Sequence, residues 1–388
     1  EKNKLTKEKF LKDRNALFIK IMKPIYERYE NHLSERKEID FADMINTATK
    51  HIESGSHKQK YSYIIIDEFQ DISIGRYQLV KAIKAKYPYC KLFCVGDDWQ
   101  SIYRFSGSDI ALFKDFEKYF GLRVKSKMET TYRFHNPLIA LSSDFIQKNA
   151  NQSKKELRGA SSTRKTDYEI HYSIKSDKDD TVVLVNIFKQ LLAAGEDIEE
   201  KEILILGRYG FDINRIKNEN DVFWINRDDE TVSYSIKTDE GVTKKLKAQY
   251  MTVHKAKGLE GDIVIVLNCN SGKYGFPSEM SDDQVLNLLL SEADQFENGE
   301  ERRLFYVAMT RAKEKVYFVA DSSYKSKFIT ELEVESGKSP NKKCPFCTTA
   351  DVVLRKSGKA KNGKAYNFFG CTNYIYGCDY TATEWLNN

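Results

Sequence analysis

Two pairs of adjacent carboxylates, each directly after an apolar run, are the residues whose position first suggests chemistry. Asp67 and Glu68 follow "YSYIII", and Asp97 and Asp98 follow "KLFCVG". Ligands of open α/β sheets bind beyond the carboxyl ends of the strands, so we expect these acids at such an edge. There, one carboxylate can hold Mg²⁺ while its neighbour orients a water molecule for attack on a phosphoryl group. A solvated acidic turn explains the same residues without chemistry, so the pairs alone leave both interpretations open.

The elements that must position these acids are short apolar runs that alternate with helical patterns. Continuous apolar runs are typical of parallel strands that are covered on both faces. Such runs lie at 61–67, 91–97, 202–207, 262–268 and 315–320. Helical periodicity occupies 1–55, where Pro24 interrupts it, and also 179–194 and 301–314. This alternation predicts an α/β fold with mainly parallel sheets.

Length and composition limit the class of protein. The chain has 388 residues, 41% of them hydrophobic and 31% charged, which predicts a globular protein of about two to three domains. No apolar run approaches the ~18–20 residues of a membrane span, and the first residues lack an apolar signal region. We therefore expect a cytoplasmic protein with no membrane partner. Seven cysteines, clustered mainly near the C-terminus, favour a reducing compartment and a metal site.

Further blocks of polar and aromatic residues follow the first acids. They are "VGDDWQSIYRFSG" (95–107), "TTYRF" (130–134), "MTVHKAKGLEGD" (251–262) and "EERRLFYVAMTRAKE" (300–314). In the last block, Arg311 shares a predicted helix face with Leu304, Val307 and Ala308. A guanidinium on an apolar stripe needs an anionic partner, because an unpaired buried charge is costly. That partner is either a bound anion or a nearby Asp or Glu.

Together with "IIIDEFQD" (64–71), these blocks resemble, in their order and spacing, the motifs of superfamily 1 DNA helicases of the UvrD/Rep type. The sequence "GDDWQSIYRFSG" and the cysteine-containing tail resemble the corresponding segments of the bacterial helicase IV branch of that family. The resemblance implies two RecA-like parallel-sheet lobes with ATP and Mg²⁺ bound between them. It also implies an ATP-dependent DNA helicase that moves 3′→5′ on single-stranded DNA, unwinds partly duplex DNA, and serves DNA repair or recombination.

The same resemblance assigns roles in nucleotide chemistry to individual residues. Asp67 would serve Mg²⁺, Glu68 would be the general base, and Gln100 would sense the γ-phosphate. Arg133 and Arg311 would reach that phosphate from the second lobe. The remaining implied contacts are Tyr132 with adenine, Glu260 with ribose, Tyr103 and Phe105 with DNA bases, and Thr252 and His254 with DNA phosphates.

One family element is missing from the sequence. The phosphate-binding loop G-x-x-x-x-G-K-[ST] is absent, and the Gly-Lys-Ser at 337–339 has Leu332 where the first glycine must stand. We therefore expect a chain that begins after this loop, has an incomplete first lobe, and does not hydrolyse ATP by itself. The expected parts are a helical 1B-like remnant at 1–55, the end of the first lobe at 56–125, a second lobe without a large 2B insertion at 126–335, and a zinc finger at 336–388.

The C-terminal tail contains Cys344, Cys347, Cys371 and Cys378 as C-x₂-C and C-x₆-C pairs. Four thiolates can close a tetrahedral Zn²⁺ site, and the segment resembles the zinc finger of type IA topoisomerases. Metal-free thiols or a disulfide remain alternatives. Nearby Lys359, Lys361 and Lys364, interleaved with aromatic residues, suit single-stranded DNA, although a solvated lysine loop explains them too.

Two other functions remain open. The chain could be a non-catalytic module that binds single-stranded DNA, which the missing phosphate-binding loop favours. It could also be the helicase part of an AddA-like helicase–nuclease, although no nuclease motif is visible.

Overall fold

The computed structural model describes residues 2–173, 179–194, 196–217, 222–237, 243–280, 283, 285, 296–335, 345–346, 352–359, 364–371 and 378–385. The chain divides into two compact units, Glu1–Phe328 and Ile329–Asn388. The first unit contains the two sheets whose strands lead to or from the candidate site residues. The second unit contains the tail.

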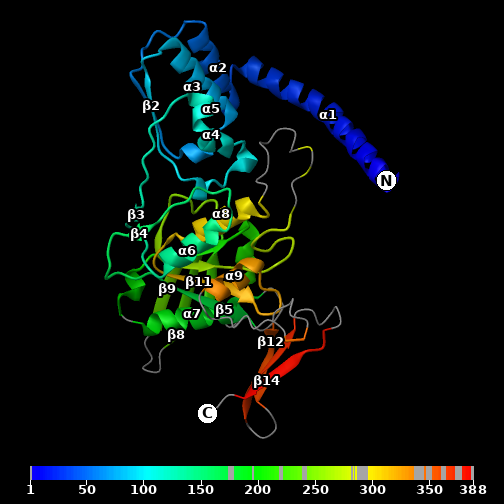
Figure 1. Ribbon diagram of the computed structural model, residues 1–388, viewed down its shortest axis with the longest axis vertical. Helices are drawn as coiled ribbons and strands as arrows, with labels where there is room; N and C mark the ends of the chain where they lie inside the picture. The colour runs from blue at the N-terminus through cyan, green and yellow to red at the C-terminus, as the bar shows by residue number, and fades with distance from the viewer. Residues whose placement is uncertain are drawn as a thin grey trace. The chain divides into compact units, whose positions relative to one another are not determined.

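The N-terminal segment is helical, as predicted. It contains α1 (Lys2–Arg36), which Figure 1 shows as one continuous helix, and α2 (Phe41–Glu53). The expected interruption at Pro24 is wrong, because Pro24 lies inside α1. Proline removes one backbone hydrogen bond, and the many other turns of so long a helix can compensate for that loss. α2 begins at a capping box in which Asp40 and Asp43 each accept the other's backbone N–H.

The first sheet is a parallel pair, β1 (Tyr63–Ile66) with β2 (Lys91–Cys94). On one face, Ile66 and Cys94 pack with Phe69 and Leu112 in a cluster rich in aromatic rings. This cluster includes side chains from α3 (Ile74–Lys86), α4 (Ile110–Lys114) and α5 (Phe116–Phe120).

The other face of the first sheet is exposed, which corrects the prediction that these strands are covered on both faces. Tyr63 is 64% exposed, Ile65 73% and Phe93 61%. The apolar run predicted burial correctly only for the alternate residues that meet α3 to α5. A continuous run cannot indicate whether the chain itself supplies both covering layers.

The second sheet has seven strands in the order β5-β11-β10-β6-β9-β8-β7. The pairs from β5 to β9 are parallel, and β8 and β7 are added antiparallel at one edge. β7 and β8 form a hairpin, and β8 also pairs with β9. The strands are β5 (Asp167–Ser173), β6 (Ile203–Gly207), β7 (Phe223–Asn226), β8 (Thr231–Lys237), β9 (Thr243–Thr252), β10 (Gly261–Val266) and β11 (Ala312–Asp321).

Helices cover both faces of this sheet. On one face, Tyr317 and Val319 of β11 join a buried cluster with Leu184 of α7 (Thr181–Ala193). On the other, Phe318 stacks on Phe305 of α8 (Gly299–Met309) with ring centroids 5.5 Å apart. Phe305 also contacts Phe145 of α6 (Leu138–Gln147). The alternation along β11 therefore confirms that this strand, from Val316 to Asp321, is buried on both faces.

One element boundary differs from the prediction. The helix expected over 301–314 ends at Met309, and β11 begins at Ala312. Residues from Lys315 onward pair with β5 and β10, so sheet pairing overrides the helical pattern of the sequence. Arg311 consequently lies in the turn between helix and strand rather than on a helix face.

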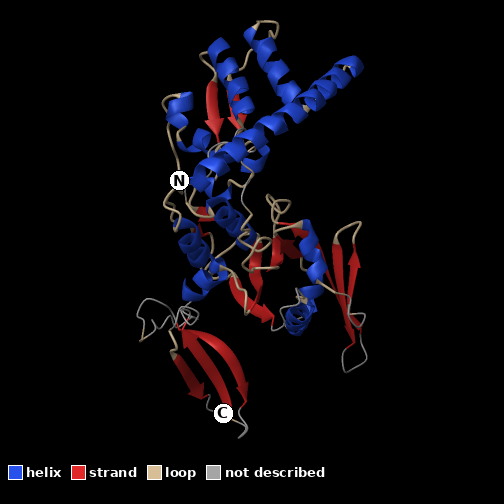
Figure 2. Cartoon of the chain, turned by 90° about the vertical axis from the view of Figure 1, so that its right-hand side faces the viewer, coloured by secondary structure: helices blue, strands red, loops and turns tan. Residues whose placement is uncertain are grey.

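The remaining elements of the chain are short or belong to the tail. They are η1 (Phe69–Asp71), η2 (Asp98–Gln100), η3 (Arg104–Ser106), β3 (Thr130–Thr131), β4 (Arg158–Gly159), η4 (Glu196–Glu200), η5 (Gly210–Arg215) and α9 (Lys327–Glu335). In the tail, β12 (Val352–Lys359), β13 (Ala365–Cys371) and β14 (Thr381–Trp385) form an antiparallel sheet (Figure 2). Within the described residues, no helix combines the length and apolar character that crossing a membrane requires.

Candidate functional site

The first acid pair stands where the sequence predicted it, directly after β1, and both side chains are exposed. Asp67 Oδ1 accepts the backbone N–H of Glu68 at 2.8 Å. Glu68 has a φ of 47°, in the left-handed region. Such a backbone costs about 1–3 kcal/mol in a residue other than glycine, and it occurs preferentially at functional sites. The turn therefore ends the strand sharply and leaves two carboxylates open to solvent.

The second acid pair, after β2, has structural partners instead. Asp97 accepts the backbone N–H of Trp99 at 3.0 Å and the side-chain amide of Gln100 at 2.8 Å. Asp98 is fully buried, and Lys155 Nζ lies 3.2 Å from its Oδ1. The edge thus holds one open pair of acids and one pair that fixes the neighbouring loop.

Lys257 joins this edge from the segment between β9 and β10, and sequence reasoning missed it. Its ammonium forms ion pairs with Asp71 and with Glu68, the latter at 3.4 Å, and donates to the backbone oxygen of Gln100 at 2.9 Å. The side chain is only 6% exposed. Burial raises the pKa of Asp71, and the bond from Lys257 opposes that rise. The signal was a lysine inside "HKAKGLEGD", a block already singled out for its other residues.

Gln100, which follows β2, and Arg311, which precedes β11, are in direct contact. Arg311 is 1% exposed, and its Nη2 donates to Gln100 Oε1 at 3.2 Å. It also donates to the backbone oxygens of Val307 and Leu259, at 3.0 and 3.3 Å, and to the Thr310 hydroxyl at 3.4 Å. Burial lowers the pKa of Arg311 to about 10. In the described part of the chain this guanidinium is thus hydrogen-bonded to neutral oxygens, not to the Asp or Glu that was one of its expected partners.

Arg133 and Glu260, both expected at the nucleotide, bind each other. Arg133 Nε donates to Glu260 Oε2 at 2.7 Å, and this bond lowers the pKa of Glu260. Lys313 Nζ lies 3.5 Å from the other carboxylate oxygen of Glu260. Tyr132, the residue expected at adenine, is 78% exposed. The structure therefore brings Arg133 and Glu260 together, and the exposed ring of Tyr132 is adjacent to Arg133 in sequence.

Tyr103, Phe105 and His254 form the first ring cluster. Their ring centroids are 5.4 to 6.2 Å apart, and the Tyr103 hydroxyl donates to the backbone oxygen of His254 at 2.9 Å. Phe105 is 63% exposed, and the ammonium of Lys257 lies 5.0 Å from the Tyr103 ring centroid. Thr252, also expected at DNA, accepts the backbone N–H of Lys255 at 3.4 Å. Aromatic residues that follow β2 and β9 thus contact one another, and Lys257 connects them to the acids.

His254 should make stability depend on pH. Burial, with a contribution from the charge of Arg208, lowers the pKa of His254 to about 4. The unfolded chain gains a proton near pH 6.5 and the folded chain does not, so stability is complete above pH 6.5 and falls as pH decreases toward 4. Between pH 7 and about 5.5 we expect a loss of about 1 kcal/mol from this residue.

The free energy of unfolding in urea, measured at both pH values for the parent and for His254→Asn, tests this effect. The asparagine variant should lose about 1 kcal/mol less between the two pH values. An identical loss in both proteins would contradict a buried neutral His254.

The predicted tail residues fall partly outside the described residues, where Cys344, Cys347 and Lys361 lie. Cys371 is buried, and Cys378 and Val352 pack against it in one cluster. Lys359 ends β12, and Lys364 is exposed. Among the described residues no group of three or more His, Cys, Asp or Glu could hold a metal ion. Half of the proposed ligand set is therefore close together, and the zinc site stays a prediction.

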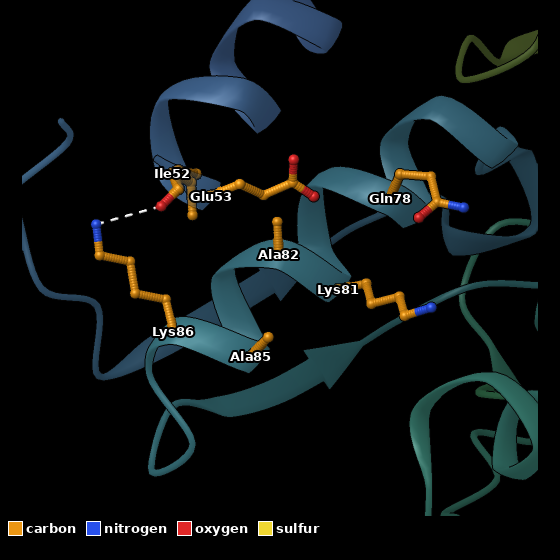
Figure 3. Close-up of a pocket in the computed structure, with 7 residues that line it drawn as sticks. All are labelled: Ile52, Glu53, Gln78, Lys81, Ala82, Ala85 and Lys86. Carbon is orange, nitrogen blue, oxygen red and sulfur yellow. Dashed lines mark hydrogen bonds between the residues drawn. The ribbon is translucent and has the colours of Figure 1, made fainter. Parts of the chain in front are cut away.

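A pocket of about 460 Å³ lies between α2 and α3, away from these residues. Figure 3 shows Glu53, Lys81 and Lys86 at its wall. Lys86 donates to the backbone oxygens of Ile52 and His57, at 3.3 and 2.7 Å, and so helps to end α2. None of the predicted site residues lines this pocket.

Comparison with protein families agrees with this geometry. Residues 1–121 match the UvrD/REP helicase N-terminal domain, and residues 229–323 match the UvrD-like helicase C-terminal domain. These two stretches of the chain thus resemble UvrD-type helicase domains. The N-terminal match contains the acids and Gln100, and the C-terminal match contains Lys257 and Arg311.

Several curated DNA helicases are similar to this chain. DNA helicase IV of Escherichia coli (strain K12) is 31% identical over 315 residues, which are 81% of this chain and 42% of that protein. A probable DNA helicase of Mycoplasma pneumoniae is 28% identical over 79% of this chain and 54% of that protein. The ATP-dependent DNA helicase PcrA of Bacillus subtilis is 31% identical over 40% of this chain and 22% of that protein. The chain thus spans about two fifths to one half of the length of the first two.

Proposed function

We propose that this chain is the part of an ATP-dependent DNA helicase that holds single-stranded DNA and supplies the acids and arginines of the nucleotide site. The observation that carries the proposal is the contact between the lobes. Arg311 reaches Gln100, while Lys257 reaches Glu68, Asp71 and the Tyr103 ring. The acids, the arginine and the aromatic rings are thereby linked in one network, as coupling of hydrolysis to movement requires.

The residues at the edge of β1 suit a nucleotide with Mg²⁺. The cation would supply charge neutralisation at the phosphates when bound, and it prefers carboxylate oxygens such as those of exposed Asp67. Glu68 would accept a proton from the attacking water, and Arg311 and Arg133 would approach the γ-phosphate. Tyr132 would pack on the base, and Glu260 would bind the ribose after releasing Arg133. Movement 3′→5′ is carried over from the family resemblance.

We further propose that the first lobe requires additional chain to hydrolyse ATP. The sequence contains no phosphate-binding loop, and the exposed apolar face of the β1–β2 pair fits a sheet that further elements would cover. The full-length relatives are about twice as long as the matched region. Zn²⁺ bound by Cys344, Cys347, Cys371 and Cys378 would complete the tail, with Lys359, Lys361 and Lys364 near DNA.

A non-catalytic DNA-binding role is the second candidate, and the missing phosphate-binding loop specifically favours it for this sequence taken alone. Both candidates share the first ring cluster as the place where bases stack. They differ in whether the Asp67–Glu68 edge contributes to turnover, and the Glu68 variant described in the Discussion separates them.

Single-stranded DNA binding tests the shared part of the proposal. Replacing Tyr103 and Phe105 together by alanine should weaken binding of a thymidine oligonucleotide about 10- to 100-fold, because each stacked base contributes about 1–3 kcal/mol. Tyr103→Phe retains the ring and loses only the hydroxyl bond to His254, so it should stay within about threefold of the parent. Fluorescence anisotropy gives both affinities. Equal binding by the double-alanine variant would remove the first ring cluster from the DNA path.

A further inference from the structure

Tyr209, Phe211 and Tyr274 form a second ring cluster that no assigned role uses. Tyr209 and Phe211 are stacked, with centroids 5.0 Å apart and planes inclined by 7°. Tyr274 stands edge-on to both rings, with centroids 5.8 and 5.6 Å away. Phe211 is 49% exposed and Tyr274 is 48% exposed. Large aromatic faces are thus presented to solvent in an ordered arrangement.

Hydrogen bonds hold this second ring cluster in place. The Tyr209 hydroxyl bonds to Ser278 Oγ at 2.7 Å, and the backbone oxygen of Tyr209 accepts from Tyr250 at 2.6 Å. The backbone oxygen of Tyr274 accepts from Asn268, which is 8% exposed, at 2.8 Å. A ligand that stacks here would therefore meet rings that are already ordered, which reduces the entropy lost on binding.

The second ring cluster lies beside the first because their strands are neighbours. Gly207, at the end of β6, pairs with Thr252 at the end of β9, and Val253 N donates to Gly207 O at 3.0 Å. Tyr209 follows the first of these ends and His254 follows the second. β10, which leads to Tyr274, pairs with the opposite side of β6. Both clusters therefore occupy the carboxyl edge of the same parallel sheet.

Cations flank the second ring cluster. The Lys273 ammonium lies 5.3 Å from the Tyr274 ring centroid, and the Arg208 guanidinium lies 4.7 Å from that of Tyr209. Glu301 holds Arg208 with two carboxylate oxygens, at 2.7 to 3.1 Å. Since Arg208 is already neutralised by Glu301, Lys273 is the cation that serves a ligand here. Exposed rings beside an ammonium match unpaired bases on a phosphate backbone, because rings stack on bases and the cation attracts phosphate.

We propose that Phe211 and Tyr274 form a second base-stacking site, which extends the path of a single nucleic-acid strand beyond Tyr103, Phe105 and His254. This inference rests on the proposed function, since it uses the first ring cluster as the neighbouring part of the path. The site takes any base, because every base offers a flat aromatic face. Lys273 adds attraction for the backbone next to the stacked base.

A comparison of two strands tests the site in the full chain. Phe211→Ala/Tyr274→Ala should weaken binding of a thymidine oligonucleotide about tenfold or more. Binding of an abasic strand of equal length should stay unchanged, because that strand retains the phosphates and lacks the bases. Phe211→Tyr/Tyr274→Phe retains both rings and should bind like the parent. Trp224→Ala removes a ring that is 71% exposed elsewhere on the lobe and serves as the matched control.

Two results of this comparison would contradict the second base-stacking site. Unchanged thymidine binding by Phe211→Ala/Tyr274→Ala overturns it, and so does an equal loss for the thymidine and abasic strands. The Tyr103→Ala/Phe105→Ala variant in the same assay keeps the two proposals apart. If that variant loses affinity and the second-cluster variant does not, the proposed function stands and only this inference fails.

Discussion

Replacing Glu68 by glutamine should lower DNA-stimulated ATP hydrolysis by about 10²–10⁴-fold, the usual contribution of a positioned general base. The change belongs in a longer protein that joins a phosphate-binding loop to these residues. Glutamine has nearly the same shape as glutamate and cannot accept the proton of the attacking water. The exposed position of Glu68 after β1 indicates that the turn survives the replacement.

Phosphate release with and without a thymidine oligonucleotide gives the rate, and anisotropy shows whether DNA is still held. Glu53→Gln is the matched control, because Glu53 lies in the pocket between α2 and α3. If Glu68→Gln hydrolyses ATP as fast as the parent, Glu68 is not the general base. If the longer protein itself has no DNA-stimulated hydrolysis, the non-catalytic binding module becomes the better account.

Replacing Lys257 by methionine should lower the free energy of unfolding by about 2–4 kcal/mol. Removing one partner of a buried ion pair leaves an uncompensated charge, which typically costs about 3–5 kcal/mol. Asp71 is that charge, and its side chain is only 16% exposed. Methionine preserves most of the volume of the lysine stem, so the loss reports on charge more than on packing.

Lys255→Met is the matched control for this change. Lys255 pairs with Glu230, but the two side chains are 60% and 39% exposed, and exposed pairs contribute only about 0–1 kcal/mol. Adding Asp71→Asn to Lys257→Met should restore part of the lost stability, because the stranded charge is removed. Equal losses at Lys255 and Lys257 in urea unfolding would show that the buried ion pair is energetically unimportant.

The sequence by itself determined the local chemistry and five of the strands in the two main sheets. Its apolar runs predicted β1, β2, β6, β10 and β11, because burial in a parallel sheet demands continuous apolar residues. Acids placed directly after such runs identified the Asp67–Glu68 edge without any tertiary information. The blocks around Gln100, Tyr103, His254 and Arg311 likewise identified side chains that the fold brings together.

Only the tertiary structure decided what depends on distant segments. Pairing of β11 with β5 and β10 ended α8 before Arg311, since a strand in register between two others gains more than one further helical turn. The lysine that links the acids to the rings, Lys257, lies 186 residues from Asp71, and local patterns carry no signal across that distance. The second ring cluster depends on the neighbouring ends of β6 and β10. Hydrophobic period and turn chemistry act over a few residues, whereas packing between strands sets which residues meet.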